Sequence, residues 1–288
     1  MTAASFPPAG ACDSHVHVIG PKSVFPLPPD RTYTPMDAPA GELRAMLTRL
    51  KLERVVLVQP SFYRTDNSCM LAAMAEIPRC RGVAVLPSKV SDAQLDDLDD
   101  KGIRGLRVNI ASAGAVPLDA VREQLFAAAR LCERHGWHVQ MFVEAETLER
   151  IAPSLLQLPV HSVIDHFGLI PPGTTDGPLR TLTRLLQSGN VWVKISGAYR
   201  TAQDPYDPRL GPLARRLVEA NPDRIVWGSD WPHTPAHGPQ RRDPLQEMPF
   251  QNQDTPGLLN LVPQWLNGDD KLVRKVLVSN PARLYGFD

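Results

Sequence analysis

Short runs of apolar and β-branched residues alternate along the chain with longer amphipathic segments. Such runs predict buried strands, and apolar residues at helical spacing predict the helices between them. The predicted strands cover residues 12–18, 54–60, 81–87, 103–109, 138–144, 162–168, 191–197 and 224–230. Eight strands that alternate with helices predict a parallel sheet, and this number favours a closed (β/α)₈ TIM barrel of the α/β class.

Several of the intervening segments carry specific helix signals. Residues 40–52 place apolar side chains at helical spacing. The stretch from Ser91 to Gln94 has the capping-box pattern that begins a helix. Residues 117–136 end at Gly136, which suits the C′ position after a helix. Two further helices are predicted over residues 176–189 and 211–222.

Two proline-rich connections are long, over residues 20–39 after the first predicted strand and residues 231–256 after the last. Long loops in a compact domain usually serve as lids or substrate walls. No linker-like or low-complexity segment interrupts the alternation, so we expect a single domain over residues 1–288.

Composition argues against several classes of partner. The chain has 288 residues, with 31 Lys and Arg against 31 Asp and Glu and a formal net charge of zero. A neutral chain without basic runs argues against nucleic acid or an anionic membrane as its main partner. No apolar run is long enough to span a bilayer, and the first ten residues lack a signal-peptide pattern. The four cysteines lack CxxC spacing, so we expect reduced thiols in a cytoplasmic protein, and the sequence leaves a homo-oligomer open.

Polar residues gather at the carboxyl ends of the predicted strands, where barrel enzymes place their reactive groups. Asp13, His15 and His17 share one face of the first strand, because side chains alternate across a strand. The later strands and the residues just beyond them offer Gln59, Ser61, Arg107, Asn109, Gln140, Glu144, His166, Lys194, Ser196, Tyr199, Arg200 and Asp230. A single histidine or aspartate here is readily explained as a hydrogen-bonded core residue or a helix cap. A cluster of them predicts a functional pocket, because burying polar groups together is costly.

Four motifs resemble the amidohydrolase superfamily: "DSHVHV" near the start, "IDHFG", "WGSDWPH" and the terminal "NPARLYGF". The closer similarity is to the branch of 2-pyrone-4,6-dicarboxylate lactonase and related sugar-lactone hydrolases, and it extends over essentially the whole chain. The resemblance implies a (β/α)₈ barrel that hydrolyses a carboxylic ester or amide. It assigns catalytic roles to His15, His17, His166 and Asp230.

The pattern departs from that of metal-dependent amidohydrolases, which usually add a histidine, lysine or glutamate ligand from the fourth or fifth strand. Arg107 and Gln140 stand at these inward positions, and His138 lies about 7 Å deeper at two residues of strand rise. An arginine opposes the binding of a divalent cation, and the lactonase branch is understood to work without metal. We therefore expect no metal or other cofactor. The alternative is one divalent cation such as zinc, held by His15, His17, His166 and Asp230.

The expected reaction is the opening of a small carboxylated lactone or sugar-acid lactone by water. Asp230 is the predicted general base, with a pKa that partial burial raises. His166, His15 and His17 are expected to donate hydrogen bonds that polarise the carbonyl group. The predicted substrate-binding residues are Arg107 and Arg200, which would clamp a carboxylate, and Ser61, Gln59, Tyr33, Gln140, Lys194 and Tyr199.

Two other functions stay open: a zinc-dependent amidohydrolase or decarboxylase, and a non-catalytic barrel that binds carboxylates. A Ser/His/Asp hydrolase fits poorly, because "WGSDW" lacks the G-x-S-x-G pattern. The resemblance also bears on the substrate, since Ala113 and Leu169 occupy positions where the dicarboxylate lactonase carries arginines. We therefore expect a lactone with one carboxylate or a sugar-acid lactone, unless Lys194, Arg241 or Arg242 replaces the missing charge.

Overall fold

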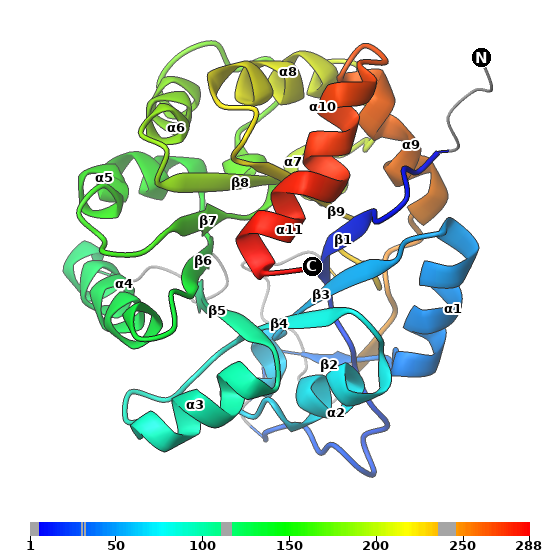
Figure 1. Ribbon diagram of the computed structural model, residues 1–288, viewed down its shortest axis with the longest axis vertical. Helices are drawn as coiled ribbons and strands as arrows, with labels where there is room; N and C mark the ends of the chain where they lie inside the picture. The colour runs from blue at the N-terminus through cyan, green and yellow to red at the C-terminus, as the bar shows by residue number, and fades with distance from the viewer. Residues whose placement is uncertain (1–5, 30, 32, 111–116, 236–245) are drawn as a thin grey trace.

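Eight parallel strands form a nearly closed barrel in the computed structural model, which describes residues 6–29, 31, 33–110, 117–235 and 246–288 (Figure 1). Neighbours along the sheet follow the chain order. The strands are β1 (Cys12–Val16), β3 (Arg54–Val58), β4 (Cys80–Ala84), β5 (Ile103–Asn109), β6 (His138–Phe142), β7 (Ser162–Ile164), β8 (Val191–Ser196) and β9 (Ile225–Gly228). Each lies mostly within a predicted strand, so the expected (β/α)₈ barrel is confirmed.

The barrel closes between its last and first strands, just beyond the end of β9. The backbone N–H of Asp230 donates to the carbonyl oxygen of His15 at 2.8 Å, and that of His17 donates to Trp231 at 2.8 Å. These two bonds join the two histidine positions to the segment that carries Asp230. The seam of the barrel therefore places the first and the last sequence motifs side by side.

Helices surround the strands, as Figure 1 shows. The long ones are α1 (Ala40–Leu50), α2 (Ser68–Glu76), α3 (Asp92–Asp100), α4 (Leu118–Glu133), α5 (Ala145–Leu155), α6 (Pro178–Gln187), α8 (Leu210–Ala220) and α9 (Thr255–Trp265). Shorter turns are η1 (Ser61–Tyr63), η3 (His166–Leu169), α7 (Ala198–Thr201), α10 (Asp270–Arg274), η4 (Lys275–Ser279) and α11 (Asn280–Tyr285). No helix in the described ranges is both long and apolar enough to cross a membrane.

The helix signals had mixed outcomes. The capping box is confirmed at the start of α3, where Ser91 and Gln94 bond each other's backbone groups. Gly136 is confirmed as the C′ residue of α4: it has φ of 64°, its N–H donates to the carbonyl oxygen of Glu133 at 3.3 Å, and the N–H of Trp137 donates to that of Cys132 at 3.0 Å. The patterns analysed above did not identify α2 or α5, and α5 carries Pro153, a residue that normally breaks a helix, in its last turn.

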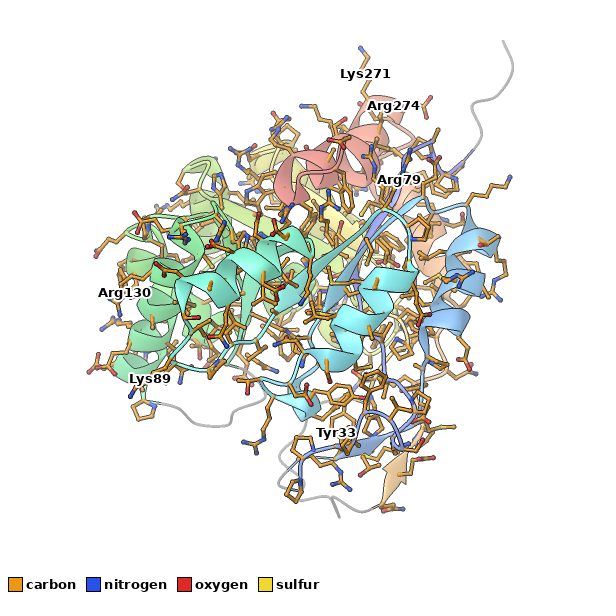
Figure 2. All side chains as sticks on the ribbon, turned by 60° about the horizontal axis from the view of Figure 1, so that its bottom comes forward. Tyr33, Arg79, Lys89, Arg130, Lys271 and Arg274 are labelled. Carbon is orange, nitrogen blue, oxygen red and sulfur yellow. The ribbon has the colours of Figure 1, made fainter. Side chains whose placement is uncertain are left out.

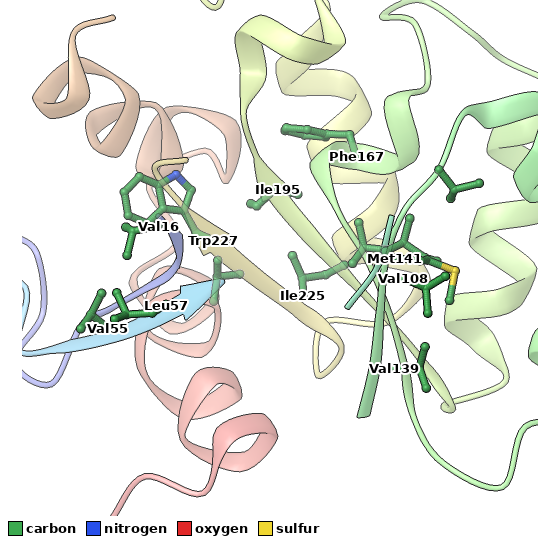
Figure 3. Packing of buried hydrophobic residues seen from close by; sticks show 14 of the residues in the cluster. Val16, Val55, Leu57, Val108, Val139, Met141, Phe167, Ile195, Ile225 and Trp227 are labelled. Atoms are coloured by element: carbon green, nitrogen blue, oxygen red, sulfur yellow. The ribbon is translucent and has the colours of Figure 1, made fainter. Parts of the chain in front are cut away.

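Apolar packing occupies two regions. Outward-facing side chains of the strands, such as Val55, Leu57 and Trp227, pack in the main core (Figure 3). At the opposite end of the barrel from the site, the C-terminal segment carries Tyr285 and Phe287 against inward-facing strand residues. In Figure 1 this segment, α11, lies across the barrel. The amino end is thus filled with apolar side chains, and the carboxyl end is left for polar groups. All four cysteines are free and buried, as expected for reduced thiols.

The two long proline-rich connections pair with each other. Strand β2 (Thr34–Pro35) runs parallel to β10 (Glu247–Met248), and Lys22 Nζ bonds Asp37 at 3.0 Å and Glu247 at 2.7 Å. These connections supply Tyr33 and Thr234 to the wall of the catalytic pocket.

Candidate active site

The two histidines of the first motif lie at the barrel seam, with His15 fully buried and His17 nearly so. Nδ1 of His17 lies 2.7 Å from the carbonyl oxygen of Val58. A carbonyl only accepts, so Nδ1 of His17 carries the proton, and the neutral ring presents an acceptor at Nε2. Burial lowers the pKa of His17, which favours this neutral form. His17 was expected to donate a hydrogen bond to the substrate, and this geometry corrects that expectation.

Asp230 is held by one of its two carboxylate oxygens. Tyr199 donates to Oδ2 at 2.6 Å, and Nε of Arg200 contacts the same oxygen. The other oxygen, Oδ1, has no hydrogen-bond partner and faces Nε2 of His17 at 3.5 Å and Nε2 of His15 at 3.7 Å. One oxygen therefore anchors the side chain, and the other is available for chemistry.

The expected pKa of Asp230 is wrong in direction. Burial raises the pKa of this carboxyl group, but the Arg200 guanidinium and the surrounding histidines together outweigh burial and hold the pKa well below its usual range. Asp230 is consequently ionised at neutral pH. It is ready to accept a proton, although as a weaker base than expected.

His166 follows β7 in a left-handed turn, with φ of 52°. Asp230 has φ of 64°, so both residues occupy a backbone region that is unfavourable for side chains other than glycine. Such strain is typical of functional positions. Nδ1 of His166 lies 3.0 Å from the Ser196 hydroxyl, which can donate to it and leave a proton on Nε2. Burial lowers the pKa of His166 to about 4, so at neutral pH this ring is a neutral donor.

A buried polar layer lies beneath the histidines and centres on Asp165, a residue for which the sequence suggested no role. Its carboxylate lies 3.3 Å from Nδ1 of His15 and 3.7 Å from Nζ of Lys194, and it accepts from Gln140 at 3.1 Å. Burial raises the pKa of Asp165, but the neighbouring His15 and Lys194 outweigh burial and lower it. Lys194 also donates to Gln140 at 2.7 Å, and burial lowers its pKa to about 8.

This layer corrects the roles expected for Lys194 and Gln140. Both side chains are fully buried, bond to each other, and do not contribute to the pocket wall. Gln59 is likewise turned away, because its amide donates to the carbonyl groups of Arg64 and Asp66. These groups support the site from below and do not reach the substrate space.

The catalytic pocket brings together most of the other predicted residues. Its described wall consists of His17, Tyr33, Pro60, Ser61, Arg107, Phe142, His166, Arg200, Asp230 and Thr234. Pro60, Phe142 and Thr234 were not predicted from the sequence as site residues. Phe142 shares the inward face with His138 and Gln140, so strand alternation would have found it. Thr234 bonds Arg200 at 2.9 Å across a loop, for which no periodic signal exists.

The two arginines differ in what holds them. Arg200 is tied to Asp230 and to Thr234. Arg107 donates through Nη1 to the carbonyl oxygen of Gln59 at 3.0 Å, its Nη2 lies 3.8 Å from Asp165, and its buried Nε has no partner. Arg107 is therefore the better placed to receive an anion. Leu169 lies in the η3 turn, and it is not part of the pocket wall. Ala113, Arg241 and Arg242 lie outside the described residues.

The donor atoms of the site fit one divalent cation in type and spacing. Ligand atoms of His15, His166 and Asp230 lie within 4.8 Å of one another, and His15 Nε2 and Asp230 Oδ1 lack partners. With His17 these residues would hold the ion, which would polarise a carbonyl oxygen and activate water. The fixed charges act against it, since the positive Arg107, Arg200 and Lys194 exceed Asp165, Asp230 and the buried Asp13, whose pKa burial raises to about 7 and which is therefore only partly ionised.

Comparison with known proteins agrees with this arrangement. The amidohydrolase family model matches residues 12–287. A 4-sulfomuconolactone hydrolase of Rhizobium radiobacter is 36% identical over 286 residues, covering 97% of this chain and 91% of that protein. A 2-pyrone-4,6-dicarboxylate hydrolase of Comamonas testosteroni is 36% identical over 296 residues, covering 96% and 90%.

A solved structure from Acinetobacter baumannii, a probable 2-pyrone-4,6-dicarboxylic acid hydrolase with citric acid bound, superposes with a TM-score of 0.81. It is 26% identical and covers 96% of this chain, which in turn covers 100% of it. The residues of the sequence motifs, His15, His17, His166 and Asp230, meet in one site. Together with the family model that matches residues 12–287, this shows that the chain belongs to the amidohydrolase family.

Proposed function

We propose that this protein hydrolyses a lactone that carries one carboxylate, with Asp230 as the general base. The observation that carries the proposal is the unbonded Oδ1 of Asp230, which faces His17 in a pocket that also contains Arg107 and Arg200. Two relatives at 36% identity are named as lactone hydrolases, which supports this reaction over other amidohydrolase reactions.

Water activation follows from the two facing acceptors. A water molecule beside the facing His17 Nε2 and Asp230 Oδ1 donates to Oδ1 within reach of Nε2, and its lone pair is directed at the lactone carbonyl carbon. As the new C–O bond forms, the water proton passes to Oδ1 of Asp230. The negative charge moves to the carbonyl oxygen, which accepts from Nε2 of His166.

Ring opening completes the reaction. The C–O bond to the ring oxygen breaks, and Asp230 returns its proton to this oxygen, so the product is a hydroxy acid and the base is regenerated. The substrate carboxylate binds the guanidinium of Arg107 in the pocket wall, whereas Arg200 mainly holds Asp230. Because only Arg107 is proposed to bind a carboxylate, a substrate with one carboxylate is favoured over one with two. Each charged hydrogen bond contributes about 1.5–3 kcal/mol to binding, and a second carboxylate would lack such a partner.

The test is acid release from a panel of lactones by the chelator-treated protein. We expect kcat/KM for a monocarboxylated or sugar-acid lactone to exceed that for 2-pyrone-4,6-dicarboxylate. A tenfold preference for the dicarboxylate would refute the single-carboxylate assignment, and no turnover of any lactone would refute the reaction itself.

The zinc-dependent alternative, an amidohydrolase or decarboxylase, draws support from one observation. His15 Nε2 and Asp230 Oδ1 are buried without partners, as metal ligands are before an ion binds. Elemental analysis separates the two candidates, as described in the Discussion.

A further inference from the structure

A second cavity of about 670 Å³ adjoins the catalytic pocket. It lies between the segment after β4, the end of β5 and helix α4, and it shares Ser61 and Arg107 with the catalytic pocket. Ligand pockets usually measure about 300–1,000 Å³. The catalytic pocket alone leaves only about 10 Å³, which is roughly the space for one water molecule. The larger space therefore begins at the residue that is expected to hold the substrate carboxylate.

The walls of this side cavity are mainly apolar. They comprise Val85, Leu86, Pro87, Leu106, Val108, Ala127, Ala128 and Leu131. Every charged residue in the described lining is an arginine, namely Arg31, Arg64, Arg107 and Arg130, and none of the lining residues named is acidic. Such a surface suits an apolar group that belongs to an anionic molecule, and it disfavours a cationic one.

Helix α4 and the segment after β4 both line this space. Arg130 on α4 and Lys89 just after β4 lie on the same flank of the barrel in Figure 2. Arg130 is exposed and forms no ion pair within the described ranges of the chain. Its charge is therefore available to attract an anionic substrate toward the mouth of the cavity.

We propose that the side cavity is a specificity subsite for an apolar arm, alkyl or aryl, on the lactone ring. This inference rests on the proposed lactone hydrolysis. The ring carboxylate binds Arg107 at the junction of the two spaces, the lactone carbonyl faces Asp230, and the arm extends along α4. The substrate is accordingly larger and more apolar than a compact dicarboxylated ring.

The direct test compares two lactones that share a ring and one carboxylate but carry a methyl or a butyl arm. Burying a CH₂ group contributes about 0.8 kcal/mol, or about fourfold in kcat/KM, so three extra groups predict a gain of about 60-fold. Ala128→Phe fills the cavity and is expected to reduce the butyl-to-methyl ratio to about one. Ala127→Phe, at a more exposed lining position, repeats the test in case Ala128→Phe does not fold.

Ala75→Phe on the exposed face of α2 is the matched control, and it should keep the full ratio. A butyl-to-methyl ratio near one in the wild-type protein would refute the subsite and leave lactone hydrolysis intact. An unchanged ratio in both cavity variants would refute it equally. If neither lactone is hydrolysed, calorimetry with the two hydroxy acids decides, since equal affinities for them would also overturn the inference.

Discussion

Nε2 of His17 faces Oδ1 of Asp230 at 3.5 Å, with an acceptor on each side of the gap. His17 Nε2 is an acceptor because Nδ1 donates its proton to the Val58 carbonyl, and Asp230 Oδ1 is an acceptor because the carboxylate is ionised. Two acceptors without a shared proton repel each other, so these lone pairs attract either a hydrogen-bond donor such as water or a metal cation that both can coordinate.

Replacing Asp230 by asparagine should lower kcat by about 10²–10⁴-fold, the usual contribution of a general base. The amide keeps the shape of the side chain, so binding of a substrate analogue should survive in calorimetric titration. Asp100→Asn, on the exposed face of α3, is the control and should leave both quantities unchanged. If kcat for Asp230→Asn stays within tenfold of the wild-type value, Asp230 is not the base.

Activity should survive removal of metal ions. The excess of fixed positive charge around the site disfavours a divalent cation. The measurement combines elemental analysis of the purified protein with assays before and after chelation. Stoichiometric zinc, whose removal stops the reaction and whose return restores it, would instead make the two histidines of the first motif metal ligands.

Asp165 and Lys194 should act through His15, because both lie beside its Nδ1, at 3.3 and 3.4 Å. The Asp165 carboxylate favours a proton on Nδ1 of His15, and the Lys194 ammonium favours one on Nε2, so Asp165→Asn and Lys194→Met shift this balance in opposite directions. We expect kcat to fall by about 10–100-fold, with KM little changed, since such supporting contacts usually have this effect. A parallel loss of folded protein in circular dichroism, with normal kcat for the remainder, would indicate a purely structural role.

Acid should destabilise the fold through its buried histidines. The pKa of His138 is lowered to about 3 by burial, whereas an unfolded histidine titrates near 6.5. Between these values the unfolded chain binds more protons, so stability is lost as the pH falls below about 6.5. For this one group the loss from pH 6.5 to 5 is on the order of 2 kcal/mol.

Urea unfolding at several pH values measures that loss. His138→Phe removes the titrating ring and should flatten the pH dependence of the free energy of unfolding. Leu156→Phe, at an exposed position that carries no titrating group, should leave the dependence as it is in the wild type. Equal slopes for both variants would show that His138 does not titrate as its burial implies.

The short apolar and β-branched runs were sufficient to predict all eight barrel strands. This succeeded because a parallel strand that is buried on both faces needs apolar residues at most of its positions, so each strand is visible in the sequence as an apolar run. The motifs likewise sufficed to identify the family, since they combine residue type with spacing.

Only the tertiary structure decided how these groups interact. Whether a histidine donates or accepts depends on a carbonyl 41 positions away, in the case of His17 and Val58. Whether a carboxylate is a strong or a weak base depends on the charge beside it, as Arg200 shows for Asp230. Lys194 and Gln140 are residue types that often bind substrates, yet both are buried beneath the site, where Gln140 donates to Asp165 and Lys194 donates to Gln140. Tautomers, pKa values and access to substrate are properties of distances between residues remote in sequence, and the order of residues along a chain does not contain those distances.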